Sequence, residues 1–218
     1  MNDVITAVET GKKVAFLTVN HGEEVLWLSR EWFTERPFAE GQEIDLDEVR
    51  QWLLPRQYPE ALNYAVSLLA LRARSTGELR QKLLQRHYME DTADMVIYKL
   101  EKERFVNDEQ FAEDYARQLS QRKLGKRRIL MELRQKGIDS RMAEDAAGQL
   151  DEEEAAEGAA QLAAKLLRKY ARESDSRKAM QKLMSAMARR GYGYDESRRA
   201  VETAMEALRS EEDADALF

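Results

Sequence analysis

Apolar residues recur at helical spacing in three similar segments of the chain. In each segment two large apolar residues stand four positions apart, as on the buried side of a helix. These pairs are Leu79 and Leu83, Ile129 and Leu133, and Leu183 and Met187. A short turn closes each segment, at positions 87, 137 and 191, so the copies are offset by 50 and then 54 residues. The pattern predicts a tandem helical repeat, an architecture that usually presents a long surface to a macromolecular partner.

The closing turns carry a signature of their own. A glycine just past a helix end adopts a left-handed conformation that caps the last carbonyl groups, and the apolar residue after it packs back onto the helix. Gly137 with Ile138 and Gly191 with Tyr192 fit this pattern. His87 takes the glycine position in the first copy, and we expect it to be a cap and not a catalytic or metal-binding histidine.

The first 45 residues follow a different pattern. Three short runs rich in β-branched and aromatic residues predict a small antiparallel meander, at residues 4–8, 14–19 and 25–28. Ser29 is a predicted N-cap for a short helix that ends before Pro37, and residues 41–44 are expected to add a strand.

A helix is predicted from about Asp45 to Leu54, and Pro55 and Pro59 then indicate a break in the chain. From Glu60 onward we expect nine helices in three groups of three. The predicted parts are a β-rich extension over residues 1–58, three-helix repeats over 59–106, 107–150 and 151–210, and an acidic tail over 211–218. Because of the break, residues 1–54 are interpreted as an accessory element.

Composition narrows the class of protein. Charged residues make up 35% of the chain and the mean hydropathy is −0.68, values poorly suited to a membrane protein. No apolar run in the sequence approaches the roughly 18 residues that a membrane span needs. The first four residues lack the basic and apolar regions of a signal peptide, and we expect a cytoplasmic protein. There is no cysteine, which excludes disulfides, thiolate nucleophiles and zinc–thiolate sites.

The sequence offers few residues for catalysis. His21 and His87 are the two histidines, and no phosphate-binding loop, serine-hydrolase motif or paired metal-binding histidines are present. The acidic residues of 108–114 are expected to be a solvated helix start. We therefore expect no enzyme activity, no cofactor and no metal site.

The charge is unevenly distributed along the chain. The whole chain carries a net charge of −6, yet residues 117–136 hold eight basic residues and one acidic residue, which is +7 in one stretch. Arg127 and Arg134 lie on one line of the predicted helix, beside its buried residues. Their equivalents in the other repeats are uncharged, so the fold does not require them. Simple solvation and binding to an acidic surface both remain open.

Three other cations occupy equivalent last-turn positions of the repeats. They are Arg86, Lys136 and Arg190. Since a cation stabilises a helix C-terminus by about 0.3–1 kcal/mol, we favour a structural role for these three.

Residues 60–208 resemble the RecX family, bacterial modulators of the RecA recombinase. The resemblance is strongest over residues 72–83, 104–112 and 125–138, which include Phe105 and the run Gly125-Lys-Arg-Arg-Ile129. It implies a mainly α fold of three tandem three-helix repeats in an elongated curved array, with a small antiparallel β-containing N-terminal extension as in some members of the family.

The resemblance implies a regulatory role and no catalysis. RecX-like proteins bind the groove of the RecA–single-stranded DNA filament and inhibit recombinase, ATPase and coprotease activity, which modulates homologous recombination, DNA repair and the SOS response. The expected partners are the RecA filament and single-stranded DNA within it, with weak binding to free DNA, and the expected state is a monomer. The candidate partner-binding residues are Arg74, Lys126, Arg127, Arg128, Arg134, Arg189 and Arg198. A helical-repeat nucleic-acid-binding module, or a protein scaffold that acts without RecA, is the alternative.

Overall fold

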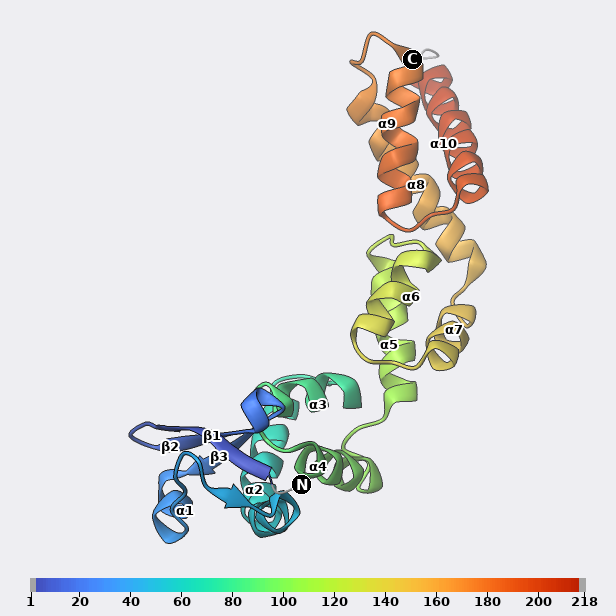
Figure 1. The fold of residues 1–218 in the computed structure, drawn as a ribbon. Helices are drawn as coiled ribbons and strands as arrows, with labels where there is room; N and C mark the ends of the chain where they lie inside the picture. Colours follow the sequence, from blue (N-terminus) through green and yellow to red (C-terminus); the bar gives the residue numbers. More distant parts are fainter. Residues whose placement is uncertain (1–2, 216–218) are drawn as a thin grey trace. The chain divides into compact units, whose positions relative to one another are not determined.

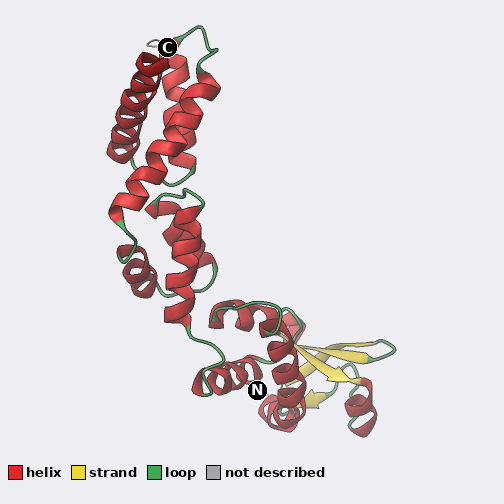
Figure 2. Cartoon of the chain, turned by 180° about the vertical axis from the view of Figure 1, so that it is seen from behind, coloured by secondary structure: helices red, strands yellow, loops and turns green. Residues whose placement is uncertain are grey.

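The computed structural model describes residues 3–215, with side chains described through residue 210. These residues form ten α-helices and a four-stranded antiparallel sheet (Figures 1 and 2). The chain divides into two compact units, Met1–Asn107 and Asp108–Phe218. The first unit holds the sheet and the first predicted repeat, and the second unit holds the other two repeats. The fold is therefore mainly α with a β-containing N-terminal part, as predicted.

The N-terminal sheet has the strand order β3-β2-β1-β4. Its strands are β1 (Asp3–Thr10), β2 (Val14–Val19), β3 (Glu24–Ser29) and β4 (Glu43–Ile44). Alternate residues of β2 are buried, as the period of a half-covered strand requires. Ser29 caps the short helix α1 (Arg30–Glu35) by accepting a hydrogen bond from the Trp32 backbone N–H at 3.2 Å. The predicted meander and the predicted cap are both confirmed.

Helix α2 (Leu46–Leu69) continues without interruption past both prolines, so the predicted break at Pro55 and Pro59 is wrong. The two prolines and Gln51 are four residues apart and exposed. The backbone carbonyls that lose an N–H partner therefore face water, which can bond to them. The opposite side of the helix is buried at every fourth residue, at Val49, Leu53, Gln57, Ala61 and Ala65. The boundary placed between residues 58 and 59 falls inside this helix.

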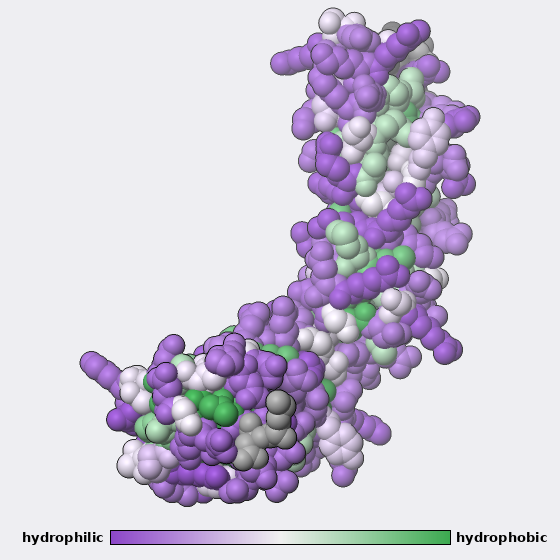
Figure 3. Space-filling model, in the orientation of Figure 1, coloured by the Kyte–Doolittle hydropathy of each residue, from purple (hydrophilic) through white to green (hydrophobic). Residues whose placement is uncertain are grey.

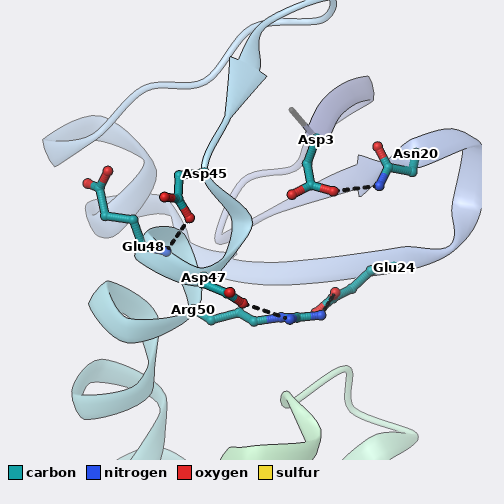
Figure 4. A network of polar contacts seen from close by, with 7 residues as sticks. All are labelled: Asp3, Asn20, Glu24, Asp45, Asp47, Glu48 and Arg50. Carbon is teal, nitrogen blue, oxygen red and sulfur yellow. Dashed lines mark hydrogen bonds and ion pairs between the residues drawn. The ribbon is translucent and has the colours of Figure 1, made fainter. Parts of the chain in front are cut away.

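Polar contacts at the start of α2 tie the helix to the sheet (Figure 4). Asp45 caps α2 by accepting from the Glu48 N–H at 3.0 Å. Arg50 donates to both carboxylate oxygens of Glu24, at the start of β3, and to Asp47 at 3.2 Å. Hydrogen bonding to Glu24 raises the pKa of Arg50 above its ordinary value.

A buried glutamine joins the sheet to the first repeat. Gln57 is fully buried, and its amide donates to the Trp27 carbonyl of β3 at 2.8 Å. Its carbonyl oxygen accepts from the Met89 N–H at 3.1 Å and from the Thr92 hydroxyl at 3.2 Å, at the start of α4 (Glu90–Lys102). One buried side chain of α2 therefore satisfies polar groups of β3 and of the start of α4, and so joins the β-containing part to the first repeat.

The remaining helices complete the predicted set of nine after the sheet. Besides α2 and α4 they are α3 (Thr76–Leu84), α5 (Asp108–Gln121), α6 (Lys126–Gln135), α7 (Ser140–Gly148), α8 (Glu152–Tyr170), α9 (Ser176–Arg189) and α10 (Tyr194–Asp215). Each repeat has its own cluster of buried apolar residues, and the three predicted apolar pairs are at most 1% exposed. Helix α10 extends into the predicted acidic tail of residues 211–218, of which residues 216–218 lie outside the described residues.

The closing turns have the predicted left-handed conformation. The backbone φ is +61° at His87, +77° at Gly137 and +92° at Gly191. In each turn the next residue donates its N–H to a carbonyl five residues earlier, as Tyr88 does to Leu83 at 3.3 Å. The His87 ring packs edge-on against Phe16 of β2, 5.1 Å between centroids, so it carries a contact that glycine does not offer.

Replacing Gln57 tests whether it joins the two parts of the first unit. Gln57→Leu removes the partner of the buried Met89 N–H and of the part-buried Trp27 carbonyl, and an unsatisfied buried group costs about 1–3 kcal/mol. We expect the free energy of unfolding, measured in urea, to fall by about 2–4 kcal/mol. The control is Gln51→Leu, on the exposed side of the same helix, which should shift it by less than about 0.5 kcal/mol. Equal effects of the two variants contradict a joining role for Gln57.

Candidate functional site

The second and third repeats meet backbone to backbone inside the second unit. The Gly125 N–H, just before α6, donates to the Arg190 carbonyl just after α9, at 2.9 Å. Gly125 is buried beneath the closing turn that contains Gly191 and Tyr192. This contact brings the N-terminus of α6 beside the C-terminus of α9.

Both of these helix ends are basic. Lys126, Arg127 and Arg128 form the first turn of α6, and Arg189 and Arg190 end α9. The Arg127 guanidinium lies beside Gly193, past the same closing turn. We define the basic surface by seven residues: Arg122, Lys123, Lys126, Arg127, Arg128, Arg189 and Arg190.

Few carboxylates neutralise this surface. Arg128 forms an ion pair with Glu132 at 2.6 Å, one turn along α6. The Arg190 guanidinium makes a long contact of 3.5 Å with the Arg122 carbonyl. Lys126, Arg127 and Arg189 are exposed, and within the described residues no ion pair joins them to a carboxylate. Their charge is thus available to an anionic partner.

The charges at the start of α6 do not stabilise the helix. The positive end of a helix dipole repels cations, by about 0.3–1 kcal/mol for each charge near the first turn. Helix α6 has no acidic residue in its first turn, and its N-cap, Gly125, makes no side-chain bond. By contrast α8 starts with three glutamates after a bonded Asp151 cap. The sequence of α6 therefore works against its own helix end, as is typical of a functional site.

The structure separates the seven predicted binding residues. Four of them, Lys126, Arg127, Arg128 and Arg189, belong to the basic surface. Arg134 pairs with Glu144 at 3.4 Å, and Arg198 bonds to Glu202 at 2.9 Å one turn along α10. Arg74 belongs to the first unit, where its side chain donates to the Leu68 carbonyl at the end of α2 at 3.3 Å. These three have structural partners, and their role in binding stays a prediction.

Three residues of the basic surface, Arg122, Lys123 and Arg190, are not among the seven predicted binding residues. In the first two repeats the cation equivalent to Arg190 lies over a tyrosine ring: Arg86 is 4.0 Å from the Tyr64 centroid and Lys136 is 5.6 Å from that of Tyr115. Arg190 instead reaches Arg122 of the neighbouring repeat. One sequence feature distinguishes this turn: Arg189 precedes Arg190, whereas the equivalent positions of the other repeats hold Gln85 and Gln135. This second cation is the signal that could have placed Arg190 in the site.

A groove of about 670 Å³ lies between the second and third repeats, next to the basic surface. Small residues of α8 and α10, such as Ala156 and Ala200, form much of its wall. Its charged residues balance, because Lys126 and Arg199 are matched by Glu152 and Glu196. The groove therefore offers no preference for anions, and we take the basic surface as the candidate site.

The described residues show no other chemical site. No group of three or more metal-binding side chains occurs among them. His21 lies in the turn between β2 and β3, and His87 lies against Phe16. No helix in residues 3–215 is long and apolar enough to cross a membrane. Figure 3 shows mostly hydrophilic residues on the face that it displays.

These features define a helical-repeat protein whose candidate site is an interaction surface. The chain belongs to the RecX family. Models of the first, second and third three-helix domains of RecX match residues 61–100, 107–146 and 152–201, more than half of the chain. It is therefore a regulatory protein of that family, with the helical repeats that the sequence predicts.

Named relatives agree with this assignment. The chain is 35% identical over 159 residues to regulatory protein RecX of Corynebacterium efficiens, which covers 69% of this chain and 76% of that one. It is 34% identical over 137 residues to RecX of Amycolatopsis mediterranei, covering 62% and 78%. A crystal structure of a regulatory protein RecX aligns with a TM-score of 0.62 at 22% identity, over 94% of this chain and 99% of that one. RecX from Lactobacillus salivarius aligns with the same TM-score at 27% identity, over 69% and 98%.

Tyr192, which is buried in the core of the third repeat, gives the protein a pH-dependent stability. Burial, with a smaller contribution from Glu196, raises the pKa of Tyr192 to about 12. A tyrosine in the unfolded chain ionises at about pH 10. The stabilisation from the neutral phenol is therefore complete below about pH 10 and is lost as the pH rises through about 12.

We expect Tyr192→Phe to abolish this loss, because phenylalanine does not ionise. Between pH 8 and pH 11 the wild-type free energy of unfolding should fall by about 1 kcal/mol more than that of the variant. Urea unfolding of both proteins at the two pH values measures the difference. Parallel behaviour of the two proteins contradicts the burial of this phenol.

Proposed function

We propose that this protein binds the RecA–single-stranded DNA filament and inhibits the recombinase, ATPase and coprotease activities of RecA. Membership of the RecX family through all three three-helix domains is the observation that carries the proposal. The basic surface supports it, since a filament of protein and DNA offers phosphates and carboxylates. The protein acts by binding, as a cytoplasmic monomer without enzyme activity, and thereby modulates homologous recombination, DNA repair and the SOS response.

The repeats provide a physical reason why binding is effective. A filament repeats the same protomer, and a repeat protein can engage several protomers at once. Once one contact forms, a second contact on the same chain forms at high effective concentration, so modest contacts add up to strong binding. Such a protein should hold protomers in a state that hydrolyses ATP slowly.

A nucleic-acid-binding module that acts without RecA is the second candidate. The seven cations of the basic surface favour it, because most affinity for nucleic acid comes from phosphate neutralisation. The sequence pI of about 5.3 argues against it, since autonomous DNA-binding domains are usually basic. Binding to free single-stranded DNA and to preformed filament, each titrated with salt, distinguishes the two candidates. Equal affinity for both favours the module.

The proposed function predicts inhibition of ATP hydrolysis. We expect the protein, at a substoichiometric ratio to RecA from the same bacterium, to lower the DNA-dependent ATPase rate. The reason is that one chain engages several protomers of the filament. A coupled ATPase assay on preformed filament measures it, with heat-denatured protein as the control. An unchanged rate with equimolar folded protein contradicts the proposal.

Charge reversal in the basic surface should weaken binding and spare the fold. We expect Lys126→Glu together with Arg127→Glu to reduce affinity for the filament by more than about tenfold in fluorescence anisotropy. Thermal stability should hold or rise, because acidic residues suit the first turn of α6.

The matched control is Lys12→Glu together with Lys13→Glu. This pair makes the same change in net charge at exposed positions of the β1–β2 turn. It should leave affinity within about twofold of the wild-type value. If both pairs weaken binding equally, total charge and not the basic surface determines affinity.

A further inference from the structure

The second helix of each repeat begins at an equivalent residue, and the second repeat is the exception. Ser75 caps α3 by accepting from the Glu78 N–H at 3.1 Å, and Asp175 caps α9 by accepting from Arg177 at 2.9 Å. Gly125 stands at the same place before α6 and provides no side chain for a cap. Glycine is itself a common N-cap residue and costs only about a few tenths of a kcal/mol relative to serine, so the reason for it lies either in its backbone conformation or in its surroundings.

The backbone conformation does not require glycine at this position. Gly125 has φ −73° and ψ 159°, and Ser75 has nearly the same values, −75° and 161°. Any residue adopts this extended conformation. The reason must therefore lie in what surrounds Gly125.

The surroundings leave no space for a side chain. A Cβ atom on Gly125 would lie 2.6 Å from the carbonyl carbon and oxygen of Gly191 and from the nitrogen of Tyr192. All three are backbone atoms of the closing turn, which cannot rotate aside as the end of a side chain can. Glycine at 125 is thus required by the close approach of another repeat.

The requirement is reciprocal. A Cβ atom on Gly191 would lie 2.4 Å from the backbone nitrogen and the Cβ of Arg128. Gly191 also has a left-handed φ, so both its backbone conformation and the close approach of Arg128 require glycine there. At Gly125 only the close approach requires glycine. The two glycines and the hydrogen bond from Gly125 to Arg190 form one contact, which we name the glycine joint.

The glycine joint determines which cations become neighbours. Lys126, Arg127 and Arg128 follow Gly125 directly, and Arg189 and Arg190 precede Gly191. A change of distance at the joint therefore moves two groups of cations relative to each other. The other hydrogen bond between the two repeats within the described part of the basic surface, from the Arg190 guanidinium to the Arg122 carbonyl, is longer, at 3.5 Å against 2.9 Å.

We propose that the glycine joint holds the basic surface of two repeats in one fixed geometry that the partner recognises, and that Gly125 is a positioning residue for binding. This inference rests on the proposed function for the identity of the partner. Any side chain at position 125 separates the repeats and divides the basic surface into two halves that bind independently. Gly125 itself contacts no partner.

Gly125→Ala and Gly125→Ser test the proposal together. Alanine adds one methyl group to an allowed backbone, and serine adds the same Cβ but restores a capping hydroxyl. If the cap alone matters, serine should improve the protein; if the close approach matters, both variants should open the joint. The control is Gly148→Ala, at the end of α7, where an added Cβ has no atom within 4 Å.

The first measurement does not depend on any partner. The chain has no cysteine, so two introduced cysteines will be the only sites that take a spin label. We choose the exposed positions Ser140→Cys on α7 and Gln181→Cys on α9. We expect a narrow distance distribution by electron–electron resonance in the parent and in Gly148→Ala, and a broad or shifted one in both Gly125 variants. Circular dichroism should show the helix content of the parent in all four proteins.

The second measurement is binding to RecA filament. Both Gly125 variants should bind about tenfold more weakly, with a smaller dependence on salt, and Gly148→Ala should bind like the parent. An unchanged distance distribution in the Gly125 variants overturns the joint. A broad distribution with parental affinity overturns the positioning role. If the parent itself does not bind filament, the proposed function fails while the distance measurement still decides the joint.

Hydrogen exchange covers the case in which the Gly125 variants do not fold. In the unmodified protein the Gly125 amide should exchange as slowly as the core amides of α6, because the joint opens only with the unit. Fast exchange at Gly125 beside slow exchange in α6 overturns a fixed joint.

Discussion

The close approach of two backbones at Gly125 and Gly191 is the constraint on which the second unit depends. Side chains normally keep neighbouring helix ends apart, and here both positions lack one. The repeats can then share a backbone hydrogen bond, while the Tyr192 side chain is buried in the core of the third repeat. Because of this contact, the cations at the start of α6 lie near those at the end of α9, although about 60 positions separate them in the sequence. The close contact at Gly125 and Gly191, which leaves no space for a methyl group, thus determines which positive charges lie together on the surface.

The same closing turn makes different contacts in the first and third repeats. In the first repeat its left-handed residue is His87, whose ring packs on Phe16 of the sheet. In the third repeat it is Gly191, which packs on the second repeat. A histidine at 191 has no space, and a glycine at 87 offers no ring to Phe16. The turn is therefore common to the repeats, while the residue at its left-handed position is selected by its neighbour.

Local patterns were sufficient to predict the strands, the apolar pairs, the cap at Ser29 and the left-handed turns, because each depends on residues close in sequence. They were insufficient for α2, where the effect of two prolines depends on which side of the helix faces water. Gln51, Pro55 and Pro59 face solvent only because the sheet and the first repeat cover the other side. Three predicted binding residues of the basic surface, Lys126, Arg127 and Arg128, follow one another in sequence, whereas Arg189 and Arg190 join them through the contact between repeats.

The N-terminus of α6 has residues that local helix preferences do not favour, and these residues need a functional explanation. Gly125 provides no capping side chain, at a cost of about a few tenths of a kcal/mol, and three cations lie at the positive end of α6, at about 0.3–1 kcal/mol each. Neither is needed to form the repeat, since α3 and α9 have bonded caps. Selection for stability alone would remove both. Because the two departures coincide at adjacent residues, one cause explains them best: a surface that must be both basic and fixed in shape.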